Sequence, residues 1–444
     1  MEIYTVEGGY NLTGEVRVSG AKNVALKVLI ASLLTDEEVL IENIPSISDV
    51  FSLIEMLKEI GVRIETDEKK HRLVVSAREI KRNKITSPHF SKLRASFLLM
   101  IPLLLRFREV EIPLSGGDKI GVRPIDRTIE GLEKMGAKIT YQDHSHLLQA
   151  KKLTGAKYTF KKNTHTGTEA LVMAATLAWG ETVLKNASEE PEVDELIRLL
   201  NDMGAKIKRL SSRKIVINGV KKLHGTKFTI ISDRNEIVTF ICATIFTRGK
   251  TVISPVEHLH LTHFYEKLSV AGAKIEQRES RLFVNGANSD LKGIDIVTSP
   301  HPGFMTDWQA PWAVLMTGAQ GSSVVHEAVF EKRFGYISEL NKMGAGIELF
   351  NPDVKNPELF YNFNLTDRGD NFHAIRISGP KQLLGNELVI PDLRAGATLV
   401  LAALGSQGTS KLTGIEHIDR GYEKFEKRLS ALGAKIRRVE VASK

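Results

Sequence analysis

Leu200-Asn-Asp-Met-Gly-Ala-Lys-Ile207 is one of six copies of the pattern Leu-x-x-x-Gly-(Ala/Val)-x-Ile that recur along this chain. The other copies span residues 57–64, 132–139, 268–275, 340–347 and 429–436. Glycine just beyond the end of a helix takes the left-handed conformation at little cost, and the isoleucine after it is typical of a strand start. The pattern therefore predicts six helices that each end at a glycine and lead into a strand.

A second pattern precedes each copy, an apolar helix followed by a short β-branched strand. These helices are expected to begin near Val24, Ala95, Ala170, Val238, Ala310 and Ala395. Each unit should therefore run helix, strand, helix, strand. With 68 to 89 residues between glycines, the unit is too long for a solenoid repeat of roughly 20–50 residues. Six units predict an α/β fold of two similar domains with three units each.

One of the six units is longer than the others. The last two glycines, at 344 and 433, are 89 residues apart, against 72 for the preceding pair. The excess lies near residues 351–373, which are rich in Asn, Asp and Pro. This composition predicts a surface loop or hairpin insertion.

The composition excludes several classes of protein. Lys and Arg number 61 against 53 Asp and Glu in 444 residues, and the net charge of +8 suits anionic ligands. The sequence has no basic stripe rich in aromatic residues, which is the pattern that would indicate nucleic-acid binding. The single cysteine, Cys242, excludes a disulfide framework and a cysteine zinc site, and His258 and His260 lack a third metal ligand. The longest uncharged apolar run, 95–105, is shorter than the ~20 residues that span a bilayer, so we expect a cytoplasmic protein.

Cations stand at several expected helix starts, where the helix dipole disfavours them unless an anion is bound. Lys22, Arg94 and Arg394 each precede an apolar helix, and the equivalent positions of the other units are 164–168, 233–236 and 306–307. If the repeats are related by symmetry, these six starts gather in two clusters. Helix N-termini combined with Lys and Arg make a strong site for phosphate or carboxylate. The alternative is solvated charge at fraying helix ends.

Further candidate groups lie outside the helix starts. The glycine-rich stretch Pro113-Leu-Ser-Gly-Gly-Asp-Lys-Ile-Gly-Val-Arg-Pro-Ile-Asp126 carries an acid and an arginine, which favours an active-site lid or a polar surface turn. It lacks the Gly-Lys-Ser/Thr of a nucleotide P-loop. Asp307 follows a proline-stiffened stretch and suits a positioned base or an N-cap. Arg420 suits an anion clamp or a surface ion pair.

Five ordered motifs carry a resemblance to a known family. They are Ser19-Gly-Ala-Lys-Asn23, Gly116-Gly-Asp-x-Ile-Gly-x-Arg-Pro-x-Asp126, Pro300-His-Pro-x-Phe-x-Thr-Asp307, Asp392-Leu-Arg-Ala395 and His417-Ile-Asp-Arg-Gly-Tyr422. From residue 14 to about 438 the chain resembles the UDP-N-acetylglucosamine 1-carboxyvinyltransferase family of enolpyruvyl transferases. The resemblance implies two inside-out α/β barrels of three repeats each. It places the domains at 22–231 and at 1–21 with 232–444, and the active site in the cleft between them.

The resemblance also implies an activity and its residues. The protein would transfer the enolpyruvyl group of phosphoenolpyruvate to the 3-hydroxyl of UDP-N-acetylglucosamine, as a monomer without cofactor or metal. Residues implied to be catalytic are Asp118, Lys22, Asp307 and Arg394. Residues implied to bind phosphoenolpyruvate are Lys22, Asn23, Arg123, Arg394 and Arg420. Residues implied to bind the UDP-sugar are Arg94, Arg123, Pro124, Ile125, Asp126, Arg127, Thr164, His165, Thr166, Asp307 and Val329.

Some positions depart from the family pattern. Asp118 stands where most members carry cysteine, and either Asp118 or Lys22 could carry the proton to phosphoenolpyruvate. Arg127-Thr128 stand where Leu-His is common, His165 replaces a small apolar residue, and Met305 replaces a proline. Two alternatives to the implied activity stay open. One is a shikimate-pathway enolpyruvyl transferase, a class that lacks this Gly-Gly-Asp/Cys loop. The other is a basic nucleic-acid-binding paralogue on a related fold.

Overall fold

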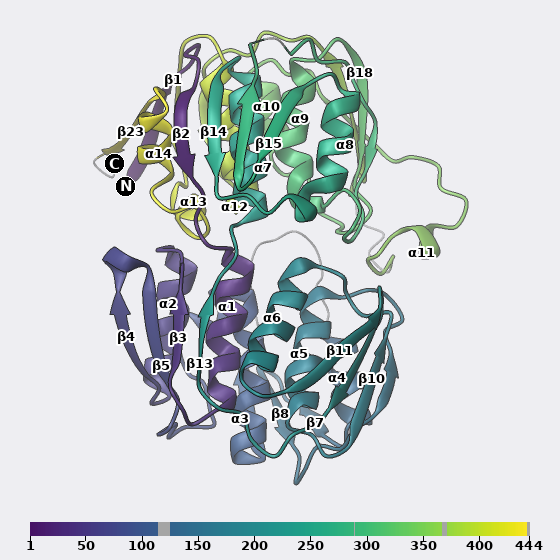
Figure 1. Ribbon diagram of the computed structural model, residues 1–444. Coiled ribbons are helices and arrows are strands. Elements are labelled where there is room, and N and C mark those ends of the chain that lie inside the picture. Colours follow the sequence, from purple (N-terminus) through teal and green to yellow (C-terminus); the bar gives the residue numbers. More distant parts are fainter. Residues whose placement is uncertain (114–124, 288, 366–370, 442–444) are drawn as a thin grey trace. The chain divides into compact units, whose positions relative to one another are not determined.

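A computed structural model describes residues 1–113, 125–287, 289–365 and 371–441 of the chain. Contacts between Cα atoms divide the described chain into two compact units (Figure 1). Unit 1 contains residues 1–19 and 232–441, and unit 2 contains residues 20–113 and 125–231. Because unit 1 combines both ends of the chain, the N-terminal strands must find their partners more than two hundred residues away.

Unit 2 is made of three consecutive repeats of helices and strands. The first contains α1 (Lys22–Ala31), η1 (Ser32–Leu34), β3 (Val39–Glu42), α2 (Ser48–Glu59), β4 (Arg63–Asp67), η2 (Glu68–Lys70) and β5 (Arg72–Ser76). The second contains η3 (Phe90–Lys92), η4 (Arg94–Leu99), α3 (Met100–Phe107), β6 (Glu109–Pro113), α4 (Asp126–Lys134), β7 (Lys138–Tyr141) and β8 (Ser145–Gln149). The third contains β9 (Lys157–Thr159), α5 (His165–Thr176), β10 (Glu181–Lys185), α6 (Pro191–Asp202), β11 (Lys206–Ser211) and β12 (Lys214–Asn218), and β13 (Thr226–Thr229) follows it.

Unit 1 repeats the same plan around the N-terminal strands β1 (Glu2–Glu7) and β2 (Thr13–Arg17). Its first repeat contains α7 (Arg234–Phe246), β14 (Lys250–Ser254), η5 (His258–Leu261), α8 (Thr262–Val270), β15 (Lys274–Arg278) and β16 (Arg281–Asn285). The second contains β17 (Ile296–Val297), η6 (Thr306–Trp308), α9 (Gln309–Thr317), β18 (Gly321–His326), α10 (Ile337–Lys342), β19 (Glu348–Phe350), α11 (Pro357–Phe360) and β20 (Ala374–Gly379). The third contains β21 (Glu387–Val389), α12 (Leu393–Gly405), β22 (Thr409–Thr413), α13 (Glu416–Asp419), α14 (Phe425–Ala431) and β23 (Lys435–Glu440).

The strands of the described residues form six small sheets with one shared pattern. Unit 2 has the orders β13-β3-β5-β4, β6-β8-β7 and β11-β12-β10-β9, and unit 1 has β15-β16-β14-β2, β17-β18-β20-β19 and β21-β22-β1-β23. In five of these sheets a short strand pairs parallel with the strand that follows the buried helix, and the other pairings are antiparallel. We call this short strand the leading strand, because in three sheets (β9, β17 and β21) it comes just before that helix in the chain; in the other two, β13 and β2 come from the segments next to the unit boundaries. In the remaining sheet a single parallel bridge, between Lys84 and Glu111, takes the place of the leading strand.

The predicted α/β fold class is confirmed, but the expected order within each unit was incomplete. The hairpin strand, such as β5 or β12, and the leading strand, such as β9 or β17, were not expected. These strands are two to six residues long and gain their stability from pairing with partners in the sheet. A segment so short carries little periodic signal of its own.

The repeated Leu-x-x-x-Gly-(Ala/Val)-x-Ile pattern is explained by one helix-ending motif. All six predicted glycines have a positive φ, between 90° and 101°. At the end of α6, Gly204 N–H donates to the Asn201 carbonyl and Ala205 N–H donates to the Leu200 carbonyl, each at 2.9 Å. These two bonds define the Schellman motif, in which the residue after the glycine also packs on the buried leucine one turn back. The prediction that a left-handed glycine ends each of these helices is confirmed.

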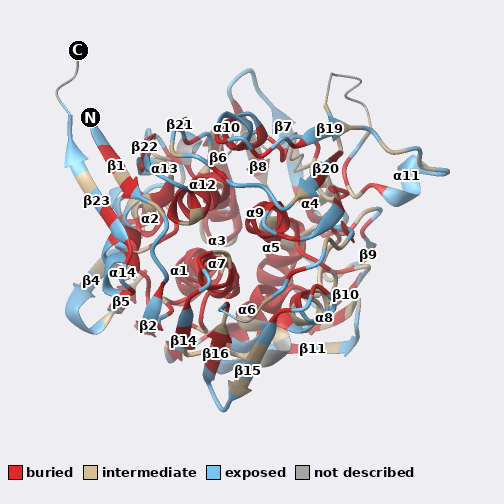
Figure 2. Cartoon of the chain, turned by 90° about the horizontal axis from the view of Figure 1, so that it is seen from above, coloured by how far each residue is buried: buried red, intermediate tan, exposed pale blue. Residues whose placement is uncertain are grey.

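The helices that open each repeat lie at the centre of their unit. In unit 1, α7, α9 and α12 pack on one another and are buried along nearly their whole length (Figure 2). In unit 2, α1 and α5 are equally buried. A helix that is apolar on all sides must be covered on all sides, and here the sheets and the outer helices cover it. Among the described residues, no helix is both long enough and apolar enough to cross a membrane.

The insertion near residues 351–373 connects the antiparallel strands β19 and β20. It contains the short helix α11, and residues 366–370 lie outside the described part. Tyr361 and Phe363 of the insertion form a small apolar cluster with Ala328, separate from the main core of unit 1. The predicted insertion is therefore the long connection of a β-hairpin, attached to the body of its unit.

Candidate active site

The starts of two of the three central helices of unit 1, α7 and α12, are capped by aspartate side chains. Asp233 caps α7 by accepting the N–H groups of Asn235 and Glu236 at 2.8 and 3.2 Å. Asp392 caps α12 by accepting the N–H groups of Arg394 and Ala395, both at 3.0 Å. Such caps satisfy N–H groups that have no partner inside the helix, so the side chains just beyond them are held in place.

Asp307, in η6 before α9, links these helix starts. Its Oδ1 lies 2.9 Å from the Arg333 guanidinium, and its Oδ2 lies 3.2 Å from Nε of Arg394. Asn235 at the start of α7 also donates to Oδ2, at 3.4 Å. One carboxylate therefore connects the first turns of α7, α9 and α12. The expected convergence of helix starts is observed in this unit.

The surroundings of Asp307 determine its charge. Burial by itself would raise the pKa of the carboxyl group, but the Arg394 and Arg333 guanidinium groups lower that pKa to about 2. Asp307 is therefore ionised at neutral pH. In this state it can accept a proton but has none to donate.

Arg394 is held from two sides. Besides its contact with Asp307, it donates from a terminal nitrogen to the Tyr422 hydroxyl at 3.0 Å, and that hydroxyl lies 2.8 Å from Oγ1 of Thr239 on α7. Arg420 lies two residues before Tyr422, at the end of α13, and is half-buried. Arg394 is thus anchored to Tyr422, which follows Arg420, the other arginine predicted to hold phosphoenolpyruvate in this unit, by two residues.

Three residues of this cluster were not predicted as site residues. Asn235 lies in a helix start that was singled out, and Tyr422 ends a motif that was quoted, but neither was assigned a role. Arg333 comes from the segment after β18, where no pattern in the sequence distinguishes it from other surface arginines. It is buried in the structure, and its guanidinium also donates to the Thr306 carbonyl at 3.3 Å.

Unit 2 holds a second group of predicted residues. Lys22 is the first residue of α1 and only 7% exposed, and its Nζ lies 2.7 Å from the buried carboxylate of Asp49 on α2. Asn23 follows it and is half-buried. Arg94 opens η4, which contacts both α1 and α5, and its guanidinium lies 5.3 Å from the centre of the Phe97 ring. The cations expected at these helix starts are therefore present in partly buried positions.

Apart from Arg94, the described residues predicted to bind the UDP-sugar in this unit come from the starts of α4 and α5, which pack together. Arg127 on α4 donates to the Asn163 carbonyl at 3.3 Å, immediately before Thr164, which caps α5 by accepting the Gly167 N–H at 3.3 Å. Ile125 precedes α4 and is half-buried, while Asp126 is exposed. The structure thus brings the segments 125–127 and 164–166, with Thr166 half-buried, side by side.

His165 belongs to a buried ionic group. Its Nε2 lies 3.0 Å from Oε1 of Glu169, and the same oxygen lies 3.3 Å from Nζ of Lys27 on α1. Burial would lower the pKa of His165, but the Glu169 carboxylate raises it above its ordinary value overall. The replacement of a small apolar residue by His165 therefore adds a group that is more readily protonated than a free histidine.

The remaining predicted site residues are Asp118, Arg123, Pro124 and Val329. Asp118, Arg123 and Pro124 lie outside the described residues. Val329 follows β18 and is half-buried, and its N–H donates to Oε1 of Glu327 at 2.8 Å. Within the described part of the chain, no group of three or more His, Cys, Asp and Glu side chains is arranged to hold a metal ion.

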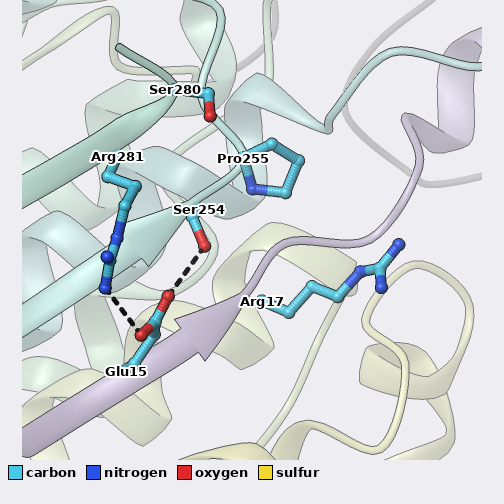
Figure 3. A pocket seen from close by; sticks show the side chains of 6 residues that line it. All are labelled: Glu15, Arg17, Ser254, Pro255, Ser280 and Arg281. Carbon is cyan, nitrogen blue, oxygen red and sulfur yellow. Dashed lines mark hydrogen bonds and ion pairs between the residues drawn. The ribbon is translucent and has the colours of Figure 1, made fainter. Parts of the chain in front are cut away.

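Unit 1 also has an open groove, and none of the predicted site residues lines it. It is lined by Glu15, Arg17, Ser254, Pro255, Ser280 and Arg281 (Figure 3). Glu15 accepts from the Ser254 hydroxyl at 3.2 Å and pairs with Arg281 at 2.8 Å, so the charges of these two side chains already offset each other. Figure 3 shows Arg17 extending away from this pair. The half-buried, arginine-flanked Asp307 is the stronger candidate for chemistry.

A family model identifies the chain. The model described as EPSP synthase (3-phosphoshikimate 1-carboxyvinyltransferase) matches residues 6–429. The chain belongs to the EPSP synthase family. Within it, UDP-N-acetylglucosamine 1-carboxyvinyltransferase 2 of Carboxydothermus hydrogenoformans is 40% identical over 99% of this chain and 100% of its own length. UDP-N-acetylglucosamine 1-carboxyvinyltransferase of Magnetococcus marinus is 41% identical over the same shares of the two chains.

Two solved structures have the same fold as this chain. The enolpyruvyl transferase NikO from Streptomyces tendae matches 99% of this chain and 99% of its own, with a TM-score of 0.85 and 24% identity. An EPSP synthase from Acinetobacter baumannii matches 99% of this chain and 100% of its own, with a TM-score of 0.71 and 19% identity. At these identities the likeness shows the EPSP synthase fold and not the substrate.

Proposed function

We propose that this protein transfers the enolpyruvyl group of phosphoenolpyruvate to the 3-hydroxyl of UDP-N-acetylglucosamine and releases phosphate. The observation that carries the proposal is the full-length identity of 40–41% to relatives named for this reaction. The cluster around Asp307 supports it, because the reaction needs a proton acceptor and fixed cations. The product would be an early precursor of peptidoglycan, made by a cytoplasmic monomer.

The cationic side chains would bind the two anionic groups of phosphoenolpyruvate. In the proposed arrangement, Arg123 and Arg420 hold the phosphate, Arg394 holds the carboxylate, and Lys22 with Asn23 contacts the same molecule. Arginine suits this purpose because its planar guanidinium donates two parallel hydrogen bonds to a phosphate or carboxylate. The proposed reaction uses residues of both units, since Lys22 belongs to unit 2 and Arg394 to unit 1.

The chemistry balances without a redox cofactor. A proton adds to the methylene carbon of phosphoenolpyruvate, and the sugar 3-hydroxyl forms a bond to the adjacent carbon while losing its own proton. The tetrahedral adduct then loses a proton from the new methyl group and expels phosphate, which restores the double bond. One general base and one general acid are therefore sufficient, with cations to stabilise the developing charge.

Asp307 is proposed as the base for the 3-hydroxyl. Its carboxylate is ionised, and Arg333, Arg394 and Asn235 fix its direction. Because its pKa is lowered to about 2, it cannot serve as the acid at neutral pH. The proton for the methylene carbon must come from another group, and Asp118 is proposed for that role, with Lys22 as the alternative.

A second candidate function has one observation in its favour. The description of the matching family model names 3-phosphoshikimate as the acceptor of the enolpyruvyl group. The two reactions share the donor and differ in the acceptor alone, so the groups proposed to hold phosphoenolpyruvate fit both. The relatives at 40–41% identity favour the UDP-sugar.

A phosphate-release assay separates these functions. Purified protein is incubated with phosphoenolpyruvate and with UDP-N-acetylglucosamine, other UDP-sugars or shikimate 3-phosphate in turn. We expect release that requires both phosphoenolpyruvate and UDP-N-acetylglucosamine. Release with shikimate 3-phosphate and none with the UDP-sugar would replace the proposal by the second function. The nucleic-acid alternative is tested by measuring binding to single-stranded RNA at increasing salt concentrations, and weak binding would exclude it.

A further inference from the structure

The two described arms of the insertion, residues 351–365 and 371–373, are tied to each other. The amide oxygen of Asn351 accepts the His373 N–H at 2.8 Å, and its amide nitrogen donates to the Asn371 carbonyl at 3.2 Å. We refer to these residues as the insertion arms. Their mutual bonds make them a defined structure and not a loose surface loop.

The insertion arms hold the backbone of the segment that follows β18. Glu327 N–H donates to the His373 carbonyl at 2.7 Å, and Asn362 N–H donates to the Ala328 carbonyl at 2.8 Å. The Ala328 N–H donates to Oγ1 of Thr298 at 2.8 Å. The backbone at 327–328 is therefore fixed by three hydrogen bonds, two of them from the insertion arms. The next residue is Val329, which is proposed to contact the UDP-sugar.

An aromatic cluster strengthens the same attachment. The Tyr361 hydroxyl and Nε2 of His326, the last residue of β18, share a hydrogen bond of 3.0 Å. The Tyr361 ring lies 4.8 Å from the Phe363 ring and 5.1 Å from the His373 ring, measured between centres. Tyr361 and Phe363 are both buried, so the contact excludes water from this part of the arms.

The side chain of Glu327 continues the connection to the candidate active site. It is 1% exposed, and its Oε1 accepts the N–H groups of Val329 and Phe330 at 2.8 and 3.0 Å. Its Oε2 accepts the Thr306 hydroxyl at 2.8 Å. Thr306 immediately precedes Asp307. A single buried carboxylate thus links the segment of Val329 to the segment of the proposed base.

We infer that the insertion arms, acting through Glu327, position Val329 and Asp307 to receive the acceptor sugar nucleotide. The inference rests on the proposed function, because it concerns the acceptor of that reaction. Glu327 is a positioning residue, since it orients the groups proposed to touch substrate through Thr306 and the 329–330 backbone. The donor, phosphoenolpyruvate, is held by other residues, so loosening this connection should weaken acceptor binding selectively.

Substitutions in the insertion arms test the inference. Tyr361→Leu removes the ring contact and the hydroxyl, and Tyr361→Phe removes the hydroxyl alone. Calorimetric titration with UDP-N-acetylglucosamine should show roughly a threefold to thirtyfold higher Kd for Tyr361→Leu and a smaller rise for Tyr361→Phe. The KM for phosphoenolpyruvate should stay unchanged in both. Leu359→Ala is the matched control, because Leu359 lies on the same insertion and is 87% exposed.

Glu327→Gln tests the connection itself. The oxygen of the new amide can still accept hydrogen bonds from the backbone N–H groups, but its nitrogen cannot accept a hydrogen bond from the Thr306 hydroxyl. We expect a higher KM for the UDP-sugar and a lower kcat, with an unchanged KM for phosphoenolpyruvate. Equal rises in both KM values, or unchanged acceptor binding in stably folded Tyr361→Phe and Glu327→Gln, would overturn the inference. Inactivity of the unmodified protein with UDP-N-acetylglucosamine would instead refute the proposed function.

Discussion

Asp307 illustrates how neighbouring side chains decide the role of a single residue. The sequence places an acid after a proline-stiffened stretch, which is compatible with an N-cap or a base. In the structure, that acid accepts from two arginines and an asparagine, and its pKa is lowered to about 2. Its ionised state at neutral pH, and not its position before a helix, leaves it able to accept a proton.

Replacing Asp307 should affect catalysis far more than replacing an ordinary acid. We expect Asp307→Asn to lower the rate of phosphate release by roughly 10²–10⁴-fold, because the proposed proton acceptor is lost. Thermal stability should fall as well, since Arg333 and Arg394 lose the carboxylate between them. Asp143→Asn, at an exposed turn between β7 and β8, serves as the control and should keep the full rate. Full activity of Asp307→Asn would exclude it as the base.

The lowered pKa of Asp307 also predicts the pH range of its contribution to stability. An acid whose pKa is lower in the folded state stabilises the protein above its unfolded pKa of ~3.9, and the stabilisation is lost as the pH falls through about 2. Melting curves of the native protein and of Asp307→Asn should therefore differ by a constant amount from pH 7 to pH 5. A difference that shrinks already between pH 7 and pH 5 would show that Asp307 titrates in that range.

Asp118 allows a prediction that depends on one functional group. The resemblance implies that the epoxide fosfomycin inhibits this family by alkylating the loop cysteine, and a thiolate is a far better nucleophile than a carboxylate. We expect the native protein to turn over in excess fosfomycin without time-dependent loss of activity. Asp118→Cys should remain active and become sensitive, whereas Asp118→Asn should lose most turnover. Cys242 is buried, with its pKa raised by burial, and should not react. Progressive inactivation with drug mass on Asp118 would contradict this prediction.

At the scale of single elements, the ends of the helices are the most strongly encoded feature. Each of the six glycines allows the chain to turn left-handed and to place the following strand at the edge of its own sheet. The buried leucine three positions before the helix cap and the small residue after the glycine complete a local apolar contact. Four specified positions in eight residues are therefore sufficient to end one element and begin the next.

Gly136 provides a clean test of this motif. Its φ is +97°, and a Cβ atom there would meet no heavy atom closer than 3.7 Å, so a substitution changes conformational strain and little else. We expect Gly136→Ala to lower the free energy of unfolding by about 1–2 kcal/mol, measured by denaturant titration. Gly136→Asn is the matched control and should cost less, because asparagine tolerates the left-handed region better. Equal losses for both variants would show that the cost is steric.

At the scale of the whole molecule, the N-terminal strand belongs to a sheet formed by the C-terminal end of the chain. β1 lies between β22 and β23 and pairs antiparallel with both. Tyr4 and Val6 on this strand are fully buried, and the Tyr4 hydroxyl donates to Glu426 at 2.9 Å. The amino group of Met1 lies 3.0 Å from the Val441 carbonyl oxygen. The two ends of the described chain therefore meet in one sheet.

Deleting residues 1–8 should therefore unfold unit 1. The deletion exposes the inner edges of β22 and β23 and removes three buried side chains, Ile3, Tyr4 and Val6, that are worth about 1.5–3 kcal/mol each. We expect an earlier thermal transition and increased binding of a hydrophobic dye. A circular permutant is the control: it joins the original ends by a short glycine linker and opens the exposed turn between residues 143 and 144. It keeps β1 in place and should melt near the temperature of the native protein. Native-like melting of the deletion variant would contradict a central role for β1.

The features that the sequence by itself determined are local ones. The helix-ending glycines, the six units, the cations at the helix starts and the insertion were all predicted from spacing and residue type. Their physical basis is short-range, because the hydrogen bonds that end a helix join residues only three to five positions apart. The motifs that carry the resemblance to UDP-N-acetylglucosamine 1-carboxyvinyltransferases are equally local, since each spans only a short stretch of the chain.

The tertiary structure alone decided which of these parts meet. Arg394 reaches Asp307 across 87 positions of the chain, Arg333 reaches it across 26, and the strand partners of β1 lie more than 400 positions away. The short leading and hairpin strands, the role of Arg333 and the attachment of the insertion through Glu327 could not be predicted for the same reason. Such contacts depend on where packing places each element, and the residue types alone do not encode that placement.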